Sequence, residues 1–304
     1  MMYATRRDFI KKSAGFLALA AAGTALDFKK EKLKLSFSTL GCPDWTFEKI
    51  AGFAAEHTYS GIEVRGIQRE MDLTKCKEFS SPENIAATLA MMKEKGLRFV
   101  NLGSSAEMHH ADTAERQKNM DEAKRFIELA EKLKCPYVRV FPNKMPKENR
   151  DATMDVIISG LKEAGSYASG TSVMVLMETH GEVVESAVLR KIMDSVNHPK
   201  VGLVWDVTNM WTITKEPPAQ VYAALRKYIH HTHIKDATLS EKGPQYKLMG
   251  KGEVPIFEAI DILYKDDYKG YYSFEWEKMW HPEIDEPEIA LADYPKAMMQ
   301  HFGR

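Results

Sequence analysis

The sequence is poor in the features that most directly reveal a function. Its 304 residues hold 42 Lys and Arg against 43 Asp and Glu, for a formal net charge of −1. This balance argues against a nucleic-acid partner, which needs a basic surface, and against a strongly basic protein partner. At 44% hydrophobic and 28% charged residues, the composition is ordinary for a globular protein. Function must therefore be sought in individual sites.

Long hydrophobic runs are also missing, apart from a short one near the N-terminus. The stretch "TRRDFIKKSAGFLALAAAGTALDF" has paired Arg6 and Arg7, then an apolar run of roughly 13 residues from Ala14 to Leu26. A stable membrane span needs about 20 such residues. The basic start and short apolar run resemble a bacterial twin-arginine export signal. We expect residues 1–26 to be a signal peptide and the mature protein to be periplasmic; an amphipathic first helix is the alternative.

Cysteine is scarce, with Cys42, Cys76 and Cys135 widely spaced along the chain. Their spacing matches no thiolate zinc site. The periplasm would permit a disulfide between two of them, but an enzyme that folds before export need not form one. We expect all three in the core or in loops.

After residue 30, short apolar or β-branched segments alternate with helix-like stretches. This texture predicts βαβ units and a parallel sheet. The predicted strands are eight: 33–40, 60–65, 97–103, 136–141, 173–180, 201–207, 228–236 and 270–277. Eight units in about 275 residues match an α/β fold of the (β/α)₈ TIM-barrel type, for which about 250 residues are typical.

Two further absences support a barrel that forms one domain. A doubly wound open sheet would place a glycine-rich phosphate turn after the first strand, and "STLGCPDWTFE" is not one. No linker rich in Pro, Gly or Ser interrupts the pattern, so we expect a single domain over residues 31–304. The longest irregular segment, 237–255, is expected to be functional because loops of that length usually are.

The last four predicted strands each end in a side chain that can bind a metal. These are Glu178, Asp206, His233 and Glu275, with spacings of 28, 27 and 42 residues. In a TIM barrel the C-terminal ends of the strands build the active site. Three carboxylates and one imidazole suit an oxygen-preferring divalent cation: Mn²⁺ above all, or Mg²⁺, Co²⁺ or Zn²⁺. Alone, a strand-end Asp is more often a helix N-cap and a His a core residue.

The segment "YIHHTHIKDA" extends this pattern. Because side chains alternate along a strand, His231, His233 and Lys235 share one face. We expect His231 one layer deeper, as a hydrogen-bonding support for the centre. Lys235 is expected to reach inward to a substrate oxygen, with Asp236 capping or holding that lysine. His230 is expected to face the helices.

The motifs "GIEVR", "VLMETHG", "LVWDVTNMW", "HTHIKD", "GKGEVPI" and "SFEWE" are similar to those of the xylose-isomerase-like TIM-barrel superfamily. Within it, the sugar phosphate isomerase and epimerase branch, with inosose dehydratase and ketose 3-epimerases, is most alike. The resemblance implies that a divalent metal is held by the four strand-end residues. It implies that Glu178 and Glu275 form the acid–base pair, and that Glu63 and His180 touch the sugar. Such barrels often form dimers or tetramers, so a homo-oligomer is among the expectations.

The resemblance implies α-proton abstraction from a sugar or keto-sugar through a metal-stabilised enediolate, giving isomerisation, epimerisation or dehydration. Export favours a substrate without phosphate. The main alternative is a lyase that cleaves 3-keto-glycosides by β-elimination. A non-catalytic sugar-binding barrel is a more distant alternative, and an endonuclease IV-like nuclease disagrees with the charge.

Other residues have open roles. Arg139 is expected to point inward to a substrate carboxylate or phosphate, or to form a supporting salt bridge. Trp276 is expected to stack on a sugar face, or else to pack in the core. His109 and His110 line the pocket or simply occupy a loop.

Overall fold

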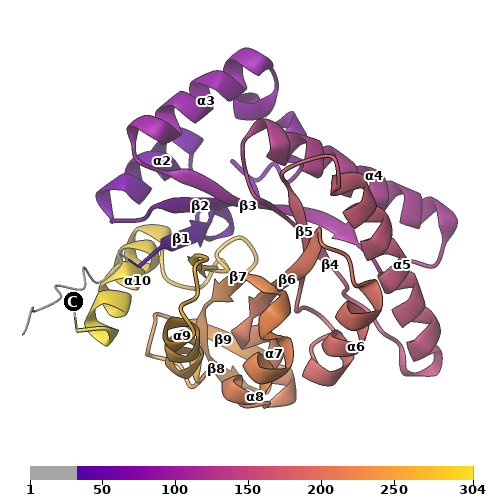
Figure 1. Ribbon diagram of the computed structural model, residues 1–304. Coiled ribbons are helices and arrows are strands. Elements are labelled where there is room, and N and C mark those ends of the chain that lie inside the picture. The colour runs from indigo at the N-terminus through magenta and orange to yellow at the C-terminus, as the bar shows by residue number, and fades with distance from the viewer. Residues whose placement is uncertain (1–32, 304) are drawn as a thin grey trace, which may run out of the picture. The chain divides into compact units, whose positions relative to one another are not determined.

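The computed structural model describes residues 33–303, so the expected export signal lies outside the described residues. Eight parallel strands close into a barrel in the order β1, β10, β7, β6, β5, β4, β3, β2 (Figure 1). Their bounds are β1 Leu35–Ser38, β2 Gly61–Val64, β3 Arg98–Glu107, β4 Tyr137–Phe141, β5 Met174–Glu178, β6 Val201–Asp206, β7 Ile229–Ile234 and β10 Tyr272–Phe274. Each lies within one of the predicted strand segments except β3, which continues beyond residue 103. The TIM-barrel prediction is confirmed.

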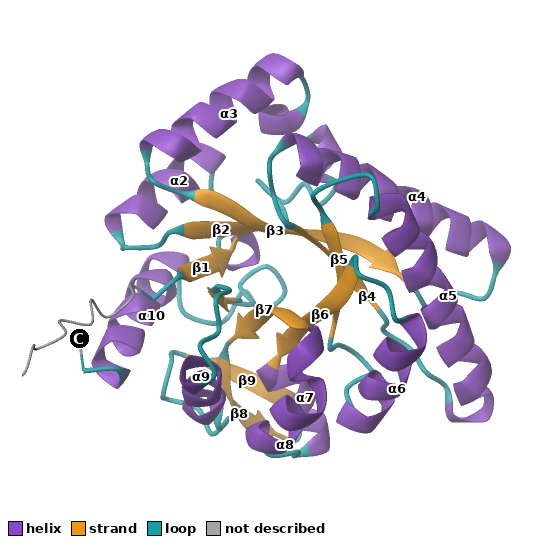
Figure 2. Ribbon diagram, in the orientation of Figure 1, coloured by secondary structure: helices purple, strands orange, loops and turns teal. Residues whose placement is uncertain are grey.

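Helices surround the strands (Figure 2). They are α2 Phe47–Glu56, α3 Pro82–Glu94, α4 Thr113–Lys132, α5 Arg150–Ala168, α6 Ser186–Val196, α7 Val207–Thr214, α8 Pro218–Leu225, α9 Ile256–Lys265 and α10 Pro287–His301. Side-chain caps mark several starts. Ser81 accepts from the backbone of Asn84 before Pro82 opens α3, and Asp112 caps α4. Such caps satisfy backbone N–H groups that the first turn leaves unpaired.

Alternation along the strands separates two kinds of core. Outside the barrel, Phe274 of β10 stacks on Tyr294 of α10, with ring centroids 4.6 Å apart. Inside it, the buried residues are largely polar. Gly103 of β3 makes room there, because an added Cβ would lie 2.7 Å from Arg65 Cδ and 2.9 Å from Arg139 Nη2. The interior is therefore built to hold charged groups, which accumulate toward the C-terminal ends of the strands.

The segment 237–255 is more regular than expected. It contains most of an antiparallel hairpin, β8 Asp236–Ser240 paired with β9 Gly243–Lys247. Both oxygens of Asp236 anchor the segment: Oδ1 accepts from the backbone N–H of Ala237, and Oδ2 accepts from Gly250 and Gly252, each at 2.9 Å. The expectation that Asp236 holds Lys235 is not met, because its carboxylate is taken up by these backbone donors.

Cys42, Cys76 and Cys135 are buried and unpaired, in agreement with the expectation that they lie in the core or in loops. Among the described residues, no helix combines the length and apolar character that crossing a membrane requires.

Candidate metal centre

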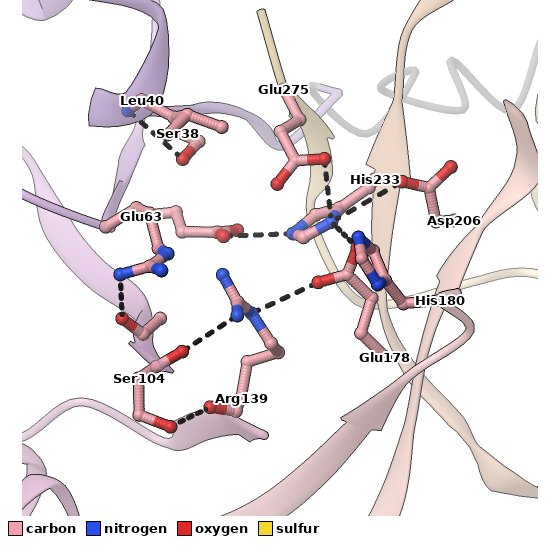
Figure 3. Close-up of polar contacts among 12 residues, drawn as sticks. Ser38, Leu40, Glu63, Ser104, Arg139, Glu178, His180, Asp206, His233 and Glu275 are labelled. Atoms are coloured by element: carbon pink, nitrogen blue, oxygen red, sulfur yellow. Dashed lines mark hydrogen bonds and ion pairs between the residues drawn. The ribbon is translucent and has the colours of Figure 1, made fainter. Parts of the chain in front are cut away.

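The four strand-end residues come together at one end of the barrel (Figure 3). One ligand atom from each of Glu178, Asp206, His233 and Glu275 lies within 4.8 Å of the others. His233 Nδ1 is central, at 3.2 Å from Glu275 Oε2, 3.4 Å from Glu178 Oε1 and 3.9 Å from Asp206 Oδ2. All four side chains are buried. The four residues lie at or next to the C-terminal ends of the adjacent parallel strands β5, β6, β7 and β10, which brings their ligand atoms together.

Asp206 combines two roles that the sequence left as alternatives. Its Oδ1 accepts from the backbone N–H of Asn209 at 2.8 Å and so caps α7. Its Oδ2 points to the cluster of the four residues. The cap fixes the carboxylate, so the second oxygen is held in place before any ligand arrives.

The donor set fits a divalent cation. Glu178 Oε2, Asp206 Oδ2 and His233 Nδ1 are buried and make no hydrogen bond. Glu178 Oε2 and Asp206 Oδ2 are balanced only by ion-pair contacts, with Arg139 Nε at 3.1 Å and Lys235 Nζ at 2.7 Å, and a bound cation would add to this compensation. Ligand atoms about 2.1 Å from one ion lie up to about 4.2 Å apart, close to the observed spacing. Glu178, Asp206, His233 and Glu275 are thus suited to hold one.

Glu63 lies below this layer. Its Oε1 accepts from His233 Nε2 at 2.9 Å, and its Oε2 accepts from His231 Nε2 at 2.8 Å and from Ser273 Oγ at 3.2 Å. His231 therefore lies where it was expected, as a buried hydrogen-bonding neighbour. Glu63 was expected to touch a sugar, but it is fully buried and both of its oxygens are taken up inside the protein.

Lys235 reaches inward, as expected, and lies among carboxylates. Its Nζ donates to Glu275 Oε2 at 2.6 Å and to Glu277 Oε1 at 2.8 Å. It also lies 2.7 Å from Asp206 Oδ2, an ion-pair contact without hydrogen-bond geometry. Tyr246 of the hairpin lies over it, with the ring centroid 5.9 Å from Nζ. The ammonium group of Lys235 thus contacts three carboxylates at the edge of the centre.

Arg139 and His180 flank Glu178. Arg139 Nε lies 3.1 Å from Glu178 Oε2, and its guanidinium stacks on Phe141 at 3.7 Å. Arg139 is only 1% exposed, so it forms the supporting salt bridge that was its alternative role. His180 lies beside Glu178 (Figure 3), and its Nδ1 donates to Asn143 Oδ1 at 2.8 Å.

Trp276 lies outside the centre. Its neighbour Glu275 points into the barrel, so Trp276 points to the helical layer. Its ring is fully buried, stacks on Phe274, and donates from Nε1 to the backbone of Asp285 at 2.9 Å. A sugar has no access to this ring, and Trp276 has the core role that was its alternative.

Burial and mutual charge shift the pKa values of the cluster. Burial raises the pKa of Asp206 to about 7; nearby Lys235 opposes this, and neighbouring carboxylates add to it. Burial also disfavours charge on Glu275, but the charges of His233 and Lys235 outweigh it and hold the pKa of Glu275 well below its usual range. Burial lowers the pKa of His233, yet the charges of Glu275, Glu63 and Glu178 raise it well above its ordinary value. The centre is thus a tightly coupled set of charges.

Two residues of the site escaped the sequence reasoning. Glu277 binds Lys235, and its two-residue spacing from Glu275 was a usable signal because both then share a strand face. Asn143, just past β4, connects His180 to Glu107 through its side-chain amide. Nothing in the local pattern indicates that contact.

The sequence from residue 52 to 296 matches the family model described as xylose isomerase-like TIM barrel. The chain belongs to this family. A search of curated proteins gave no match.

Solved structures share the xylose isomerase-like fold at low sequence identity. The probable 3-DHS dehydratase AsbF from Bacillus anthracis has a TM-score of 0.71 and 18% identity, over 88% of this chain and 99% of that one. The 3-keto-D-glucoside 4-epimerase YcjR from E. coli has a TM-score of 0.68 and 15% identity, over 90% and 100% of the chains. The IolI protein, solved with a zinc atom, has a TM-score of 0.72 and 18% identity, over 88% and 98%. At these identities the similarity establishes the fold.

Proposed function

We propose that this protein is a divalent-metal-dependent isomerase, epimerase or dehydratase acting on a sugar or keto-sugar without phosphate. The observation that carries the proposal is the convergence of Glu178, Asp206, His233 and Glu275, with three buried donor atoms that lack hydrogen bonds. The preference of three carboxylates and one imidazole for Mn²⁺ or a similar cation supports the choice of cofactor. The activities named for AsbF and YcjR support the reaction class.

The chain's own residues supply proton transfer. A bound divalent cation supplies Lewis-acid polarisation of the substrate carbonyl, which makes the adjacent C–H more acidic. Glu178 and Glu275 approach His233 from different strands, so one carboxylate is available to remove a proton and the other to return one. Lys235 and Arg139 keep positive charge beside them, which favours the deprotonated, basic form of each glutamate.

The choice of a substrate without phosphate rests on the proposed twin-arginine export to the periplasm. Among the described residues of the site, Arg139 is buried against Glu178 rather than presented to a ligand. The proposed site thus has more anionic than cationic groups at its rim, which suits a neutral polyol better than a phosphorylated sugar.

The decisive experiment follows solvent deuterium by NMR. The full chain, reconstituted with Mn²⁺, is incubated in D₂O with a panel of keto-sugars that includes 3-keto-glucosides. We expect deuterium at the carbon next to the carbonyl, and loss of exchange with a chelator. Glu178→Gln is expected to lower exchange by about 10²–10⁴-fold, because it removes one acid–base group.

The matched control is Glu131→Gln, which changes a surface glutamate that binds Ser172 and should leave exchange intact. Equal exchange in the Glu178→Gln variant would refute the role of that residue. Release of a free aglycone, in place of an epimerised glycoside, would assign the protein to the lyase alternative.

A further inference from the structure

A second cluster of metal-binding side chains lies at the end of β3, apart from the four ligands of the first centre. Glu107 is the last residue of β3, and His109 and His110 follow directly. His110 Nε2 lies 3.1 Å from Glu107 Oε2, and His109 Nδ1 lies 3.5 Å from the same oxygen. One ligand atom from each residue lies within 4.8 Å of the other two. Two imidazole nitrogens thus converge on one carboxylate oxygen.

One ring nitrogen of the cluster makes no hydrogen bond. His109 Nδ1 is buried without a hydrogen-bond partner, and the His109 side chain is 9% exposed. The rings of His109 and His110 pack against each other, with centroids 4.1 Å apart. A metal ion binds the neutral form of an imidazole through a nitrogen that carries no proton.

The carboxylate is oriented for the same purpose. Asn143 Nδ2 donates to Glu107 Oε1 at 2.7 Å, which leaves Oε2 to face the two histidines. The backbone N–H of Glu107 donates to Asn119 of α4 at 2.7 Å, which fixes the end of the strand. Hydrogen bonds that orient a ligand from behind are typical of metal sites. Glu107 and His110 are partly exposed, so a cation can reach them from solvent.

The chemistry of this cluster differs from that of the first centre. Two imidazoles and one carboxylate are the protein ligands of one class of catalytic zinc site, in which water or substrate takes the fourth position. Nitrogen-rich sets favour Zn²⁺ or Co²⁺ over Mg²⁺ or Mn²⁺. The first centre offers three carboxylates and a single imidazole, so the two sites should differ in the metal that they prefer.

Hydrogen bonds connect the cluster to His180, which lies beside Glu178 of the first centre. His180, two residues after Glu178, donates to Asn143, and Asn143 donates in turn to Glu107. Both clusters therefore lie at the same end of the barrel, where the strands β3, β4 and β5 end. We propose that Glu107, His109 and His110 bind a second divalent cation, of the Zn²⁺ or Co²⁺ type, beside the first centre.

The test is a metal count. Full-length protein is stripped with a chelator, loaded with Zn²⁺, dialysed and analysed for bound metal. We expect roughly two ions per chain for the unchanged protein and roughly one for His110→Ala, since each site binds one ion. His110 is partly exposed, so this variant should fold. His301→Ala, which changes a histidine on α10 paired with Asp261, is the matched control and should retain both ions.

A reciprocal variant separates this proposal from the first centre. The Asp206→Asn variant should lose the first ion and keep the second. When this variant is loaded with Co²⁺ instead, visible absorption should show that the remaining ion has nitrogen ligands. If the unchanged protein binds two ions but shows no deuterium exchange with any sugar of the panel, the proposed function is wrong and the second metal site stands. A count of one ion in the unchanged protein, or an unaltered count in His110→Ala, would overturn the second site.

Discussion

Glu63 and His233 share a buried hydrogen bond in which His233 Nε2 donates to Glu63 Oε1 at 2.9 Å. Because a carboxylate only accepts, this contact places a proton on Nε2 and leaves Nδ1 directed at the three carboxylates. Glu63 comes from β2 and His233 from β7, and the strands β1 and β10 lie between these two in the barrel. The contact therefore spans the barrel interior and sets both the tautomer and the ring orientation of a candidate ligand.

Replacing Glu63 tests this positioning. Glu63→Gln removes the charge that supports the imidazole but retains an oxygen that can accept from one histidine. We expect divalent-metal affinity to fall by about 10–100-fold, the usual effect of losing such a supporting group. Competition with a chromophoric chelator measures it. Glu283→Gln, at an exposed Glu–His pair with His281, is the control; equal affinity in the Glu63 variant and this control would contradict the prediction.

The pH dependence of metal binding has a definite sign. Burial raises the pKa of Asp206 to about 7, so below that pH a proton occupies the carboxylate that a cation requires. The raised pKa of His233 places a competing proton on Nδ1 as well. Metal binding must release these protons, so apparent affinity should rise with pH from 6 to 8, by about tenfold per unit for each proton released. Titrations at fixed ionic strength measure it, and a flat profile would refute the coupling.

Lys235 should contribute strongly to the stability of the metal-free protein against unfolding. Lys235→Met removes the cation that contacts Asp206, Glu275 and Glu277. Breaking a buried ion cluster in this way leaves unpaired charge and should cost about 3–5 kcal/mol of unfolding free energy. Urea unfolding with a chelator present measures the loss, and saturating Mn²⁺ should recover much of it.

The control for this prediction is another ion-paired lysine. Lys227→Met removes an exposed pair with Asp194 and should change stability by about 1 kcal/mol or less. Equal losses in the two lysine variants, or no recovery with Mn²⁺, would show that Lys235 does not hold the buried carboxylates together.

Gly252 should be intolerant of a side chain. An added Cβ would lie 2.1 Å from Asp236 Oδ1 and 2.6 Å from the nitrogen of Ala237. Gly252→Ala should therefore detach the loop from Asp236 and increase hydrogen exchange and protease cleavage within residues 237–255. Gly170→Ala, where the Cβ would have no neighbour within 4 Å, should leave both unchanged. Unchanged protection in Gly252→Ala would sink the anchoring role of Asp236.

Much of the fold was predictable because strands and helices have different hydrophobic periods, and because the alternation of strand and helix recurs eight times along the chain. The convergence of Glu178, Asp206, His233 and Glu275 was also predictable, since successive parallel strands end on the same side. Their function as metal ligands stays a prediction. Because Trp276 directly follows Glu275, the two side chains had to point in opposite directions. The position of Trp276 near a strand end nevertheless led to the expectation that it stacks on a sugar.

The remaining contacts depend on information that local patterns do not contain. Glu63 meets His231 and His233 across about 170 residues of sequence, and which strands face each other depends on barrel tilt and stagger. The partners of Asp236 are backbone groups, whose positions follow from the conformation of the loop. The hairpin itself is short and polar, so it lacks the alternation that marks the barrel strands.

The two ends of the hairpin segment meet at a single point. Asp236 holds its beginning and its return at Gly250 and Gly252, while the backbone N–H of Glu253 donates to Ala237 at 2.9 Å. The residues between these contacts, Tyr246 among them, are therefore held next to Lys235 from both ends of the segment. Variants of this protein with other segments between the same two attachment points would change the surroundings of Lys235 while Asp236 keeps the junction itself in place.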